Sequence, residues 1–461
     1  MLRFWDRLLG NTVTPAPTQH CWTSQQWHPT WQCSIEGPLI MSNPQSQRDF
    51  AVEIVRQLRD AGHKAFWAGG CVRDRLLSLE PKDYDVATSA RPDEVRELFG
   101  HRRTLAIGAA FGVISVLGGP SRGPIEVATF RADGAYVDGR HPIEVVFTGA
   151  EQDAQRRDFT INGLFYDPLE ETVIDYVGGQ QDLESGIVRA IGDPRARFAE
   201  DKLRMLRAVR FAAAFGFQIE ADTLVAIGEM AEEIKVVSAE RIGMELRRML
   251  VHEHRARAVS WLESTGLLKQ VVSCWPSAEQ AGVEKRLPAK LQKTLATLDR
   301  LESPSLPLAL AALLNQCEPS QTSPSVAREL RYTKKEAEFT GWLLTHVPQV
   351  GCAHETPWPA VQRLLVHPGA HDLVALHEAL VGGEDEGAAF CRAKLQLPTE
   401  TLNPPPLVDG ADLVAHGVPP GPAFAELLQH LRDAQLDGRI ADREQALTVA
   451  DEWLRSRGEQ S

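Results

Sequence analysis

The spacing of hydrophobic residues changes along the chain and divides it into regions. Between residues 50 and about 190, short apolar runs alternate with segments of helical spacing. Phe50, Ile54 and Leu58 form the stripe of one helix face, because residues four apart lie on the same side of a helix. Strands are predicted at short apolar runs, namely residues 66–68, 84–87, 105–108, 112–117, 125–130 and 173–177. This region is therefore predicted to be an α+β domain.

From about residue 195 the pattern is helical. Residues 199–217 have apolar residues near helical spacing, so one continuous helix is predicted there. A charged residue recurs at every third position, at Asp201, Arg204, Arg207 and Arg210. On a helix this spacing gives a polar stripe. Such stripes are often solvated faces with internal ion pairs, whereas three arginines together on an acidic chain indicate a local basic patch.

The two ends of the chain give weaker signals. Helices are predicted for residues 246–268, for the Leu- and Ala-rich residues 271–403, and for a tail that follows a linker of three prolines at 404–406. Residues 1–45 lack periodicity and a continuous apolar run, so they predict a disordered leader and not a signal peptide. Patterned sequence begins after Met41, which we expect to be the true start.

The most specific chemistry lies early in the α+β region. Gly69 and Gly70 follow a predicted strand and precede a helix that is predicted to start near Arg73. Glycines allow a backbone to approach a phosphate, and a helix start offers free N–H groups. Asp83 and Asp85 lie two apart at the mouth of the next strand, so their side chains would point to the same face.

Two carboxylates this close repel one another unless a cation lies between them. Their oxygen atoms suit Mg²⁺. A phosphate-binding backbone beside metal-binding carboxylates predicts phosphoryl or nucleotidyl transfer. A lone Asp-x-Asp is more often a solvated loop, and a glycine pair is common in turns. The prediction therefore depends on finding both in one strand–helix–strand unit.

Other polar residues are candidates for the same site. Glu126 alternates with apolar residues on a later strand; it could add a third carboxylate, or be solvated at a sheet edge. Residues 131–142 are rich in glycine and charge and predict a mobile loop, either over the site or as a connector. Arg156, Arg157 and Asp158 fit a helix start capped by Asp158, or arginines on phosphate with the carboxylate on a ribose hydroxyl.

Composition limits the partners and the compartment. The 461 residues are 43% hydrophobic and 24% charged, which is ordinary for a globular chain of about two to four domains. The formal net charge of −13 means that a nucleic acid would need a local basic face. Seven scattered cysteines without a CxxC pair indicate free thiols in a reducing cytoplasm. No apolar run is long enough to span a membrane.

Taken in order, these motifs resemble those of the class II tRNA nucleotidyltransferases, the bacterial CCA-adding enzymes and their poly(A) polymerase relatives. The motifs cover roughly residues 61–268, and the tail pattern from Gly410 is similar to that of CCA-adding members. Their first residues are Gly69, Asp83, Glu126, Tyr136, Arg156, Glu200 and Glu240. One departure is Gly163, where the family more often has alanine.

The resemblance implies a polymerase-β-like nucleotidyltransferase head, with a mixed sheet plus helices, followed by an all-helical neck, body and tail. The implied boundaries are residues 46–190 for the head, 191–270 for the neck, 271–403 for the body and 404–461 for the tail.

The resemblance also implies roles for individual residues. The catalytic carboxylates would be Asp83, Asp85 and Glu126, and the first two, with Glu126, would hold two Mg²⁺ ions for two-metal nucleotidyl transfer. The triphosphate would be held by Gly69, Gly70 and Arg73, and Asp74 would belong to the same nucleotide-binding set. Phosphate and ribose would be bound by Arg157, Asp158 and Asn162. The base of CTP or ATP would pair with Asp201 and Arg204, positioned by Glu200, and Arg207 and Arg210 would back either that site or the phosphates.

The leading hypothesis is addition of C, C and A without a template to a tRNA 3′ end, from CTP and ATP. A relative that adds only A, to tRNA or to another RNA 3′ end, remains an alternative because the base-pairing motif is shared. A small-molecule nucleotidyltransferase is a remote alternative, disfavoured by the helical half. An RNA-binding protein with an inactive head would lack carboxylates that this chain has. The oligomeric state is left open.

Overall fold

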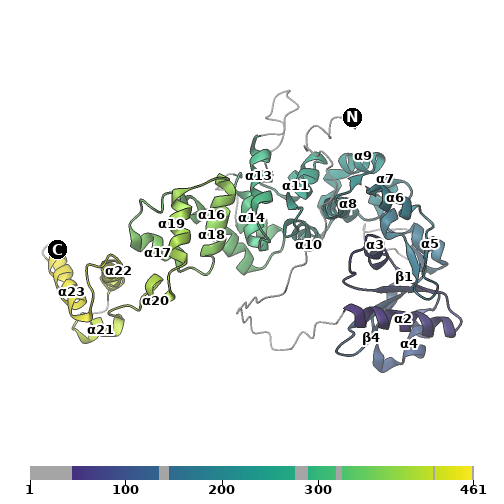
Figure 1. The fold of residues 1–461 in the computed structure, drawn as a ribbon, viewed down its shortest axis with the longest axis horizontal. Helices are drawn as coiled ribbons and strands as arrows, with labels where there is room; N and C mark the ends of the chain where they lie inside the picture. The colour runs from purple at the N-terminus through teal and green to yellow at the C-terminus, as the bar shows by residue number, and fades with distance from the viewer. Residues whose placement is uncertain (1–43, 134–144, 276–288, 318–323, 419–420, 459–461) are drawn as a thin grey trace, which may run out of the picture. The chain divides into compact units, whose positions relative to one another are not determined.

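The structure, a computed structural model, describes residues 44–133, 145–275, 289–317, 324–418 and 421–458. A mixed sheet is followed along the chain by helices (Figure 1). Of the predicted leader, residues 1–43 lie outside the described residues, and helix α2 (Pro44–Asp60) already begins at residue 44. Met41 and residues 134–142 of the predicted loop also lie outside them.

The sheet has seven strands in the order β3-β4-β5-β2-β1-β8-β9. They are β1 (Ala65–Ala68), β2 (Asp85–Thr88), β3 (Thr104–Gly108), β4 (Val113–Leu117), β5 (Pro124–Thr129), β8 (Phe165–Asp167) and β9 (Thr172–Ile174). Strands β2 and β5 are parallel, and the other neighbours are antiparallel. The predicted strands are all present, with small shifts at their ends.

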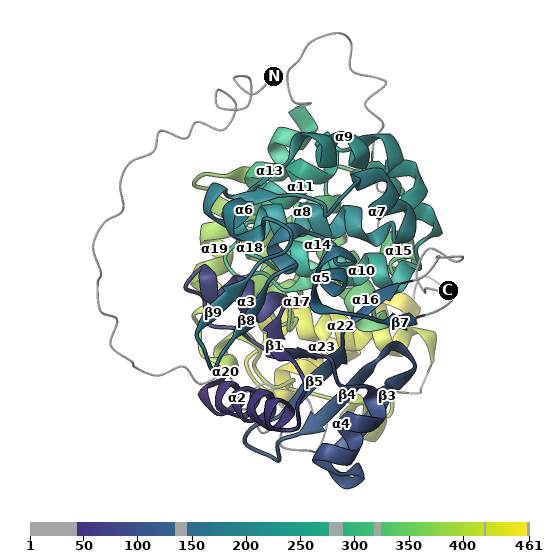
Figure 2. The same cartoon turned by 90° about the vertical axis from the view of Figure 1, so that its right-hand side faces the viewer.

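The two faces of the sheet have different neighbours. Trp67, Val86 and Val127 point into the main core, where α2 and α4 (Pro92–Phe99) pack against the sheet (Figure 2). The alternate residues, such as Phe66 and Ala87, point to a smaller apolar cluster on the other face, which includes residues of α5 (Ala150–Gln155). Because side chains alternate along a strand, Asp85 shares this second face.

The long helix predicted at residues 199–217 is wrong in one respect, because it is two helices. Helix α7 (Pro194–Glu200) ends before Asp201, whose backbone is extended (φ −147°, ψ 104°), and α8 (Leu203–Phe215) follows. The Asp201 carboxylate accepts a hydrogen bond from the Leu203 N–H (3.1 Å). Aspartate competes in this way with helical hydrogen bonding, so it favours helix starts over helix interiors.

Residues 246–268 are likewise divided. They belong to α10 (Ala239–Leu250), α11 (Arg255–Ser264) and the start of α12 (Leu268–Val271). Short turns separate these helices, and both α10 and α11 pack against α8.

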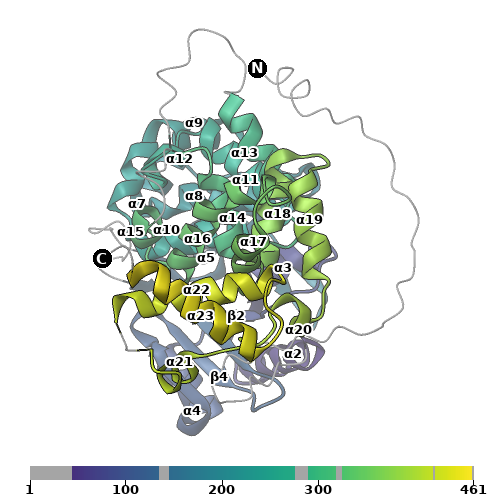
Figure 3. The same cartoon turned by 90° about the vertical axis from the view of Figure 1, so that its left-hand side faces the viewer.

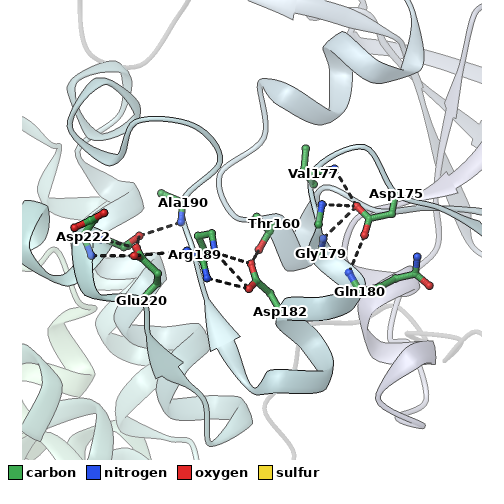
Figure 4. A network of polar contacts seen from close by, with 12 residues as sticks. Thr160, Asp175, Val177, Gly179, Gln180, Asp182, Arg189, Ala190, Glu220 and Asp222 are labelled. Atoms are coloured by element: carbon green, nitrogen blue, oxygen red, sulfur yellow. Dashed lines mark hydrogen bonds and ion pairs between the residues drawn. The ribbon is translucent and has the colours of Figure 1, made fainter. Parts of the chain in front are cut away.

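A polar network joins the last part of the α+β region to the helices after it (Figure 4). The buried carboxylate of Asp182, on α6 (Gly179–Ser185), accepts a hydrogen bond from the Thr160 hydroxyl (2.7 Å) and pairs with Arg189 (3.0 Å). Arg189 also contacts Glu220 (3.6 Å), which caps α9 (Ala221–Met230). Strands β10 (Ile187–Val188) and β11 (Gln218–Ile219) pair beside this network. The network therefore crosses the predicted head–neck boundary at residue 190.

The rest of the described chain is helical, as predicted. The helices of residues 271–403 are α13 (Ala289–Arg300), α14 (Leu306–Leu314), α15 (Pro324–Glu329), α16 (Lys334–Gly351), α17 (Trp358–Leu365), α18 (Ala370–Val381), α19 (Glu386–Leu395) and α20 (Thr399–Leu402). The helices of the tail are α21 (Gly410–Ala415), α22 (Pro422–Leu436) and α23 (Arg443–Gly458). Helices α22 and α23 pack together around a small core of their own, with Leu413 and Leu427 (Figure 3). No helix of the described residues is both long and apolar enough to cross a membrane.

Candidate active site

A polar cavity of about 560 Å³ lies where the sheet region meets helix α8. Its lining includes nearly all of the predicted site residues, namely Gly69, Gly70, Arg73, Asp83, Asp85, Arg157, Asp158, Asn162, Asp201, Arg204, Arg207 and Arg210. Arg156 and Phe211 line it as well. Asp74, Glu126 and Glu200 do not line it; Asp74 and Glu200 pair with arginines that do, and Glu126 lies beside Asp85.

The glycine pair turns the chain from β1 into helix α3 (Gly70–Leu76). This helix begins at Gly70, earlier than the predicted start near Arg73. Gly69 has a positive φ of 71°, which glycine adopts without strain. A Cβ atom on Gly69 would lie 2.9 Å from Nη1 of Arg157. Glycine is therefore needed here both for the turn and for the arginine that lies against it.

Arg73 is buried and held from three sides. Its Nη1 donates to the Asn162 side-chain oxygen (2.6 Å), and its Nε and Nη2 donate to one oxygen of Asp74 (2.8 and 2.6 Å). The guanidinium also lies over the ring of Phe215, 4.6 Å from its centroid. Asp74 thus contacts Arg73 directly and orients it toward the cavity.

The carboxylates lie at the start of β2. Tyr84, between Asp83 and Asp85, is buried, and its ring packs against Trp67 at 4.8 Å, so it points away from the cavity as predicted. Glu126 on β5 is the register partner of Asp85. The Asp85 side chain is exposed to the cavity. Among the described residues, no group of three His, Cys, Asp or Glu residues is arranged to hold a metal ion.

The pKa of Asp85 reports on the charge of the carboxylate corner, which consists of Asp83, Asp85 and Glu126. Removal from water raises the pKa to about 6, and the negative charges of Asp83 and Glu126 add to the rise. The positive charge of Arg157 lowers this pKa. The corner therefore carries more negative charge than its positive neighbours balance, as expected of a site that binds a cation.

Asp158 is in the opposite situation. One oxygen accepts hydrogen bonds from the Phe159 N–H (2.8 Å) and the Asn162 amide (3.1 Å), and the other pairs with Arg207 of α8 (2.6 Å). Burial alone would raise the pKa of Asp158, but the charge of Arg207 and these hydrogen bonds lower it to about 2. Of the two alternatives for residues 156–158, the helix start capped by Asp158 is not found as an α-helix, because only the 3₁₀ turn Thr160–Asn162 follows and no side chain caps it.

The helix α8 side of the cavity is fixed by ion pairs. Arg204 donates to Glu200 (2.6 Å) and to the carbonyl of Arg197 (3.0 Å). Arg241 of α10 donates to the second oxygen of Asp201 (2.7 Å). Asp201 and Arg204 therefore present a carboxylate and a guanidinium to the cavity in set orientations.

The remaining arginines are held in the same way. Arg210 donates to the buried carboxylate of Glu245 on α10 (2.5 Å), which also pairs with Arg248 (3.0 Å). Desolvation lowers the pKa of Arg210, whereas the charge of Asp158 raises the pKa of Arg207. Helix α10 thus holds α8 through charged side chains.

Sequence comparison assigns both regions to known families. Residues 65–189 match the model described as "Poly A polymerase head domain", and residues 216–279 match "Probable RNA and SrmB- binding site of polymerase A". The CCA-adding enzyme of Levilactobacillus brevis is 32% identical over 408 residues, which are 87% of this chain and 97% of that protein. The chain belongs to the family of CCA-adding enzymes.

Solved structures of CCA-adding enzymes agree with this assignment. The Bacillus stearothermophilus CCA-adding enzyme in complex with CTP is 27% identical, with a TM-score of 0.69, and the match covers 91% of this chain and 100% of that one. The Thermotoga maritima CCA-adding enzyme complexed with tRNA_CCA is 20% identical, with a TM-score of 0.63 and coverage of 90% and 98%, and it shares the fold. The predicted family and fold class are confirmed, and this CCA-adding family member is a nucleotidyltransferase.

Sequence reasoning gave no role to several residues that build the site of this family member. Arg241 and Glu245 lie in the motif that begins at Glu240, but their partners, Asp201 just before α8 and Arg210 on α8, could not be read from spacing. Asp153 was missed altogether, although it stands three and four residues before Arg156 and Arg157. That spacing is the usual one for ion pairs on a helix, so it was the available signal.

Proposed function

We propose that this protein adds C, C and A to tRNA 3′ ends from CTP and ATP, without a template. The observation that carries the proposal is that one cavity holds the Asp83–Asp85 pair on one side and the Asp201–Arg204 edge on the other. A bound nucleotide can then contact both with its phosphates and its base. The relatives named above were solved with CTP and with tRNA_CCA, which supports this choice of substrates.

The carboxylate corner suits a divalent cation, and we propose Mg²⁺. Asp83 and Asp85 offer hard oxygen ligands, and the raised pKa of Asp85 reflects negative charge that a cation would neutralise. Glu126 adds charge next to Asp85. Mg²⁺ held there would lower the pKa of the attacking 3′-hydroxyl and stabilise the charge that develops on the leaving pyrophosphate.

The chain's own residues bind and orient the nucleotide. The backbone turn at Gly69 and Gly70 provides a close approach for phosphate, and Arg73 and Arg157 supply positive charge beside it. Asn162 donates to Asp158 and accepts from Arg73, so its orientation is fixed. We assign phosphate binding to these arginines and contacts to the ribose to Asp158 and Asn162.

We assign the choice of base to Asp201 and Arg204. A carboxylate only accepts hydrogen bonds and a guanidinium only donates them, so together they can match one edge of a base. A buried polar group without a partner costs about 1–3 kcal/mol. Two such failures would disfavour UTP or GTP by roughly 30-fold to 10⁴-fold, at about 1.4 kcal/mol for each factor of ten.

We further assign RNA binding to the neck arginines and the tail, through the backbone and shape of tRNA. The head, neck, body and tail would keep the boundaries 46–190, 191–270, 271–403 and 404–461. The described cysteines are free thiols, which supports a reducing compartment such as the cytoplasm.

The test is to offer the purified protein three tRNA transcripts, ending before the first C, between the two cytidines, and before the final A. CTP and ATP are supplied separately and together with Mg²⁺. We expect CTP alone to add the cytidines and ATP alone to extend only the third transcript. If only the third transcript is extended, and only where ATP is supplied, the protein is instead an A-adding enzyme.

A further inference from the structure

Asp153 on helix α5 is almost completely buried, at 1% exposure, and carries a charge that the assignments above do not use. Two arginines share its carboxylate. One oxygen accepts from Nε and Nη2 of Arg156 (2.9 and 2.8 Å), and the other accepts from Nε and Nη2 of Arg157 (3.2 and 3.0 Å). Each guanidinium is therefore gripped by two hydrogen bonds, which fix its plane as well as its position.

The same carboxylate also fixes neighbouring backbone. The Arg131 N–H at the start of β6 (Arg131–Asp133) donates to Asp153 (3.2 Å), and the Arg131 carbonyl accepts from Nε of Arg156 (3.1 Å). Arg157 uses its remaining Nη1 to donate to the Asn162 carbonyl (3.3 Å), beside Gly69. Asp153 thus sets where Arg157 lies against the glycine turn.

Arg156 connects this arrangement to the base-reading side. Its carbonyl accepts long hydrogen bonds from Arg197 and Arg204 (both 3.4 Å). Arg197 also pairs with Glu200 (3.0 Å), which in turn pairs with Arg204. A chain of contacts therefore runs from Asp153 through Arg156 to the guanidinium assigned to the base.

We propose that Asp153 is a positioning residue that sets the phosphate-side Arg157 and, through the backbone of Arg156, the base-side Arg204 in one arrangement. This inference rests on the proposed function. Two adjacent guanidinium groups repel one another, and one buried carboxylate between them removes that repulsion. Arg157 and Arg156 also lower the pKa of Asp153 against the opposing effect of burial, so the carboxylate stays ionised at neutral pH.

The test is Asp153→Asn in the full-length protein, with tRNA transcripts as substrate. The amide keeps the shape but loses the charge and replaces one acceptor with a donor. We expect the KM for both CTP and ATP to rise about tenfold or more, and the kcat/KM ratio of UTP to CTP to rise as well. The loss of one phosphate contact would raise the KM alone. A change in both the KM and the UTP-to-CTP ratio therefore indicates that Asp153 positions both sides of the cavity.

The matched control is Asp167→Asn. Asp167 is also buried and paired with an arginine, Arg59, but it does not line the cavity. We expect the control to lower Tm and leave both kinetic readouts unchanged. If folded Asp153→Asn likewise lowers Tm alone, the positioning role is refuted.

Two further variants keep the inference open to refutation. In an Arg157→Ala background, Asp153→Asn should raise KM by less than threefold, since its main intermediary is gone; a second full tenfold rise would contradict the inference. If Asp153→Asn does not fold, Asp153→Glu shifts the carboxylate by one methylene, and normal KM and selectivity would then refute the role. Failure of the unaltered protein to extend any transcript would refute the proposed function instead.

Discussion

Asp85 and Asp158 line the same cavity, yet their pKa values move in opposite directions. Asp85 is removed from water and has two like charges nearby, so its pKa rises to about 6. Asp158 has Arg207 and two further hydrogen-bond donors, and its pKa falls to about 2. The head corner is thus left with negative charge for an incoming cation, whereas the side facing α8 is neutralised and fixed before any ligand binds.

The largest expected effect comes from the head corner. Asp85→Asn should reduce nucleotide transfer by about 10³-fold or more, because metal-ion catalysis supplies several kcal/mol of transition-state stabilisation at about 1.36 kcal/mol for each factor of ten. Single-turnover extension of tRNA with CTP measures this. Asp93→Asn, at an exposed aspartate of α4, is the control. Retained turnover of Asp85→Asn would remove the metal assignment.

The same variant should not lose stability. Because the folded-state pKa of Asp85 is raised, its charged form costs stability at neutral pH, and this cost is absent below its ordinary pKa near 3.8. After allowance for the exposure of the side chain, Asp85→Asn should gain about 1 kcal/mol at pH 7.5 and nothing at pH 4. A loss of stability of Asp85→Asn at pH 7.5 would show that the ionised Asp85 carboxylate does not destabilise the fold.

The next largest effect concerns the choice of base. Arg204→Ala should lower the preference for CTP over UTP by about 10-fold to 100-fold, because one or two hydrogen bonds to the base are lost. The ratio of kcat/KM values measures it. Arg204→Lys keeps the charge but not the planar fork of donors, so it should recover little selectivity. Unchanged selectivity in Arg204→Ala would remove the templating role.

Removing the charge of Asp158, on the side of the cavity that faces α8, should change the free energy of unfolding in the opposite direction from Asp85→Asn. Asp158→Asn leaves Arg207 without its carboxylate and should lower the free energy of unfolding by about 2 kcal/mol at pH 7. Because the folded-state pKa is lowered, this contribution is present above the ordinary value near 3.8 and is lost as pH falls toward about 2. The difference from the unaltered protein should therefore shrink between pH 4 and pH 2, by denaturant unfolding. An equal difference in unfolding free energy between the two proteins at pH 4 and at pH 2 would contradict this expectation.

The smallest effect is a shift in a pH profile. Transfer activity should fall as pH drops through about 6, because protonated Asp85 cannot hold the cation, and more Mg²⁺ should move the fall to lower pH. Glu126→Gln removes one of the charges that raise this pKa, so it should move the midpoint down by less than about one unit. An upward shift would mean that Glu126 itself binds the metal.

Local pattern was sufficient for six of the seven strands of the sheet, the glycine turn and the direction of Tyr84, since these follow from alternation and backbone preference. It did not predict β8. It failed where distant segments decide the outcome. Asp201 interrupts the predicted helix, and its carboxylate meets an arginine forty positions later. Asp158 meets Arg207 across 49 positions. Ion pairs of this kind depend on how helices pack, which residue spacing along one chain does not encode.

Gly163, which the resemblance to the family marked as a departure, has a reason in the packing around it. A Cβ atom there would lie 2.6 Å from a methyl group of Val177 and 3.1 Å from one of Ile191. Alanine, which the resemblance to the family leads us to expect, would therefore require these neighbours to move. The sequence revealed the difference, and only the packing around it supplies a reason.

The break at Asp201 separates two tasks within the fold. The carboxylates that we assign to the chemical step lie at or just before the start of strand β2, whereas the groups that we assign to the base lie at a helix start more than a hundred residues later. Substitutions in one turn at the start of α8 would therefore change which base is accepted, without altering the strands that carry the carboxylates. Enzymes that share this head but add different nucleotides to an RNA 3′ end would need few substitutions to diverge.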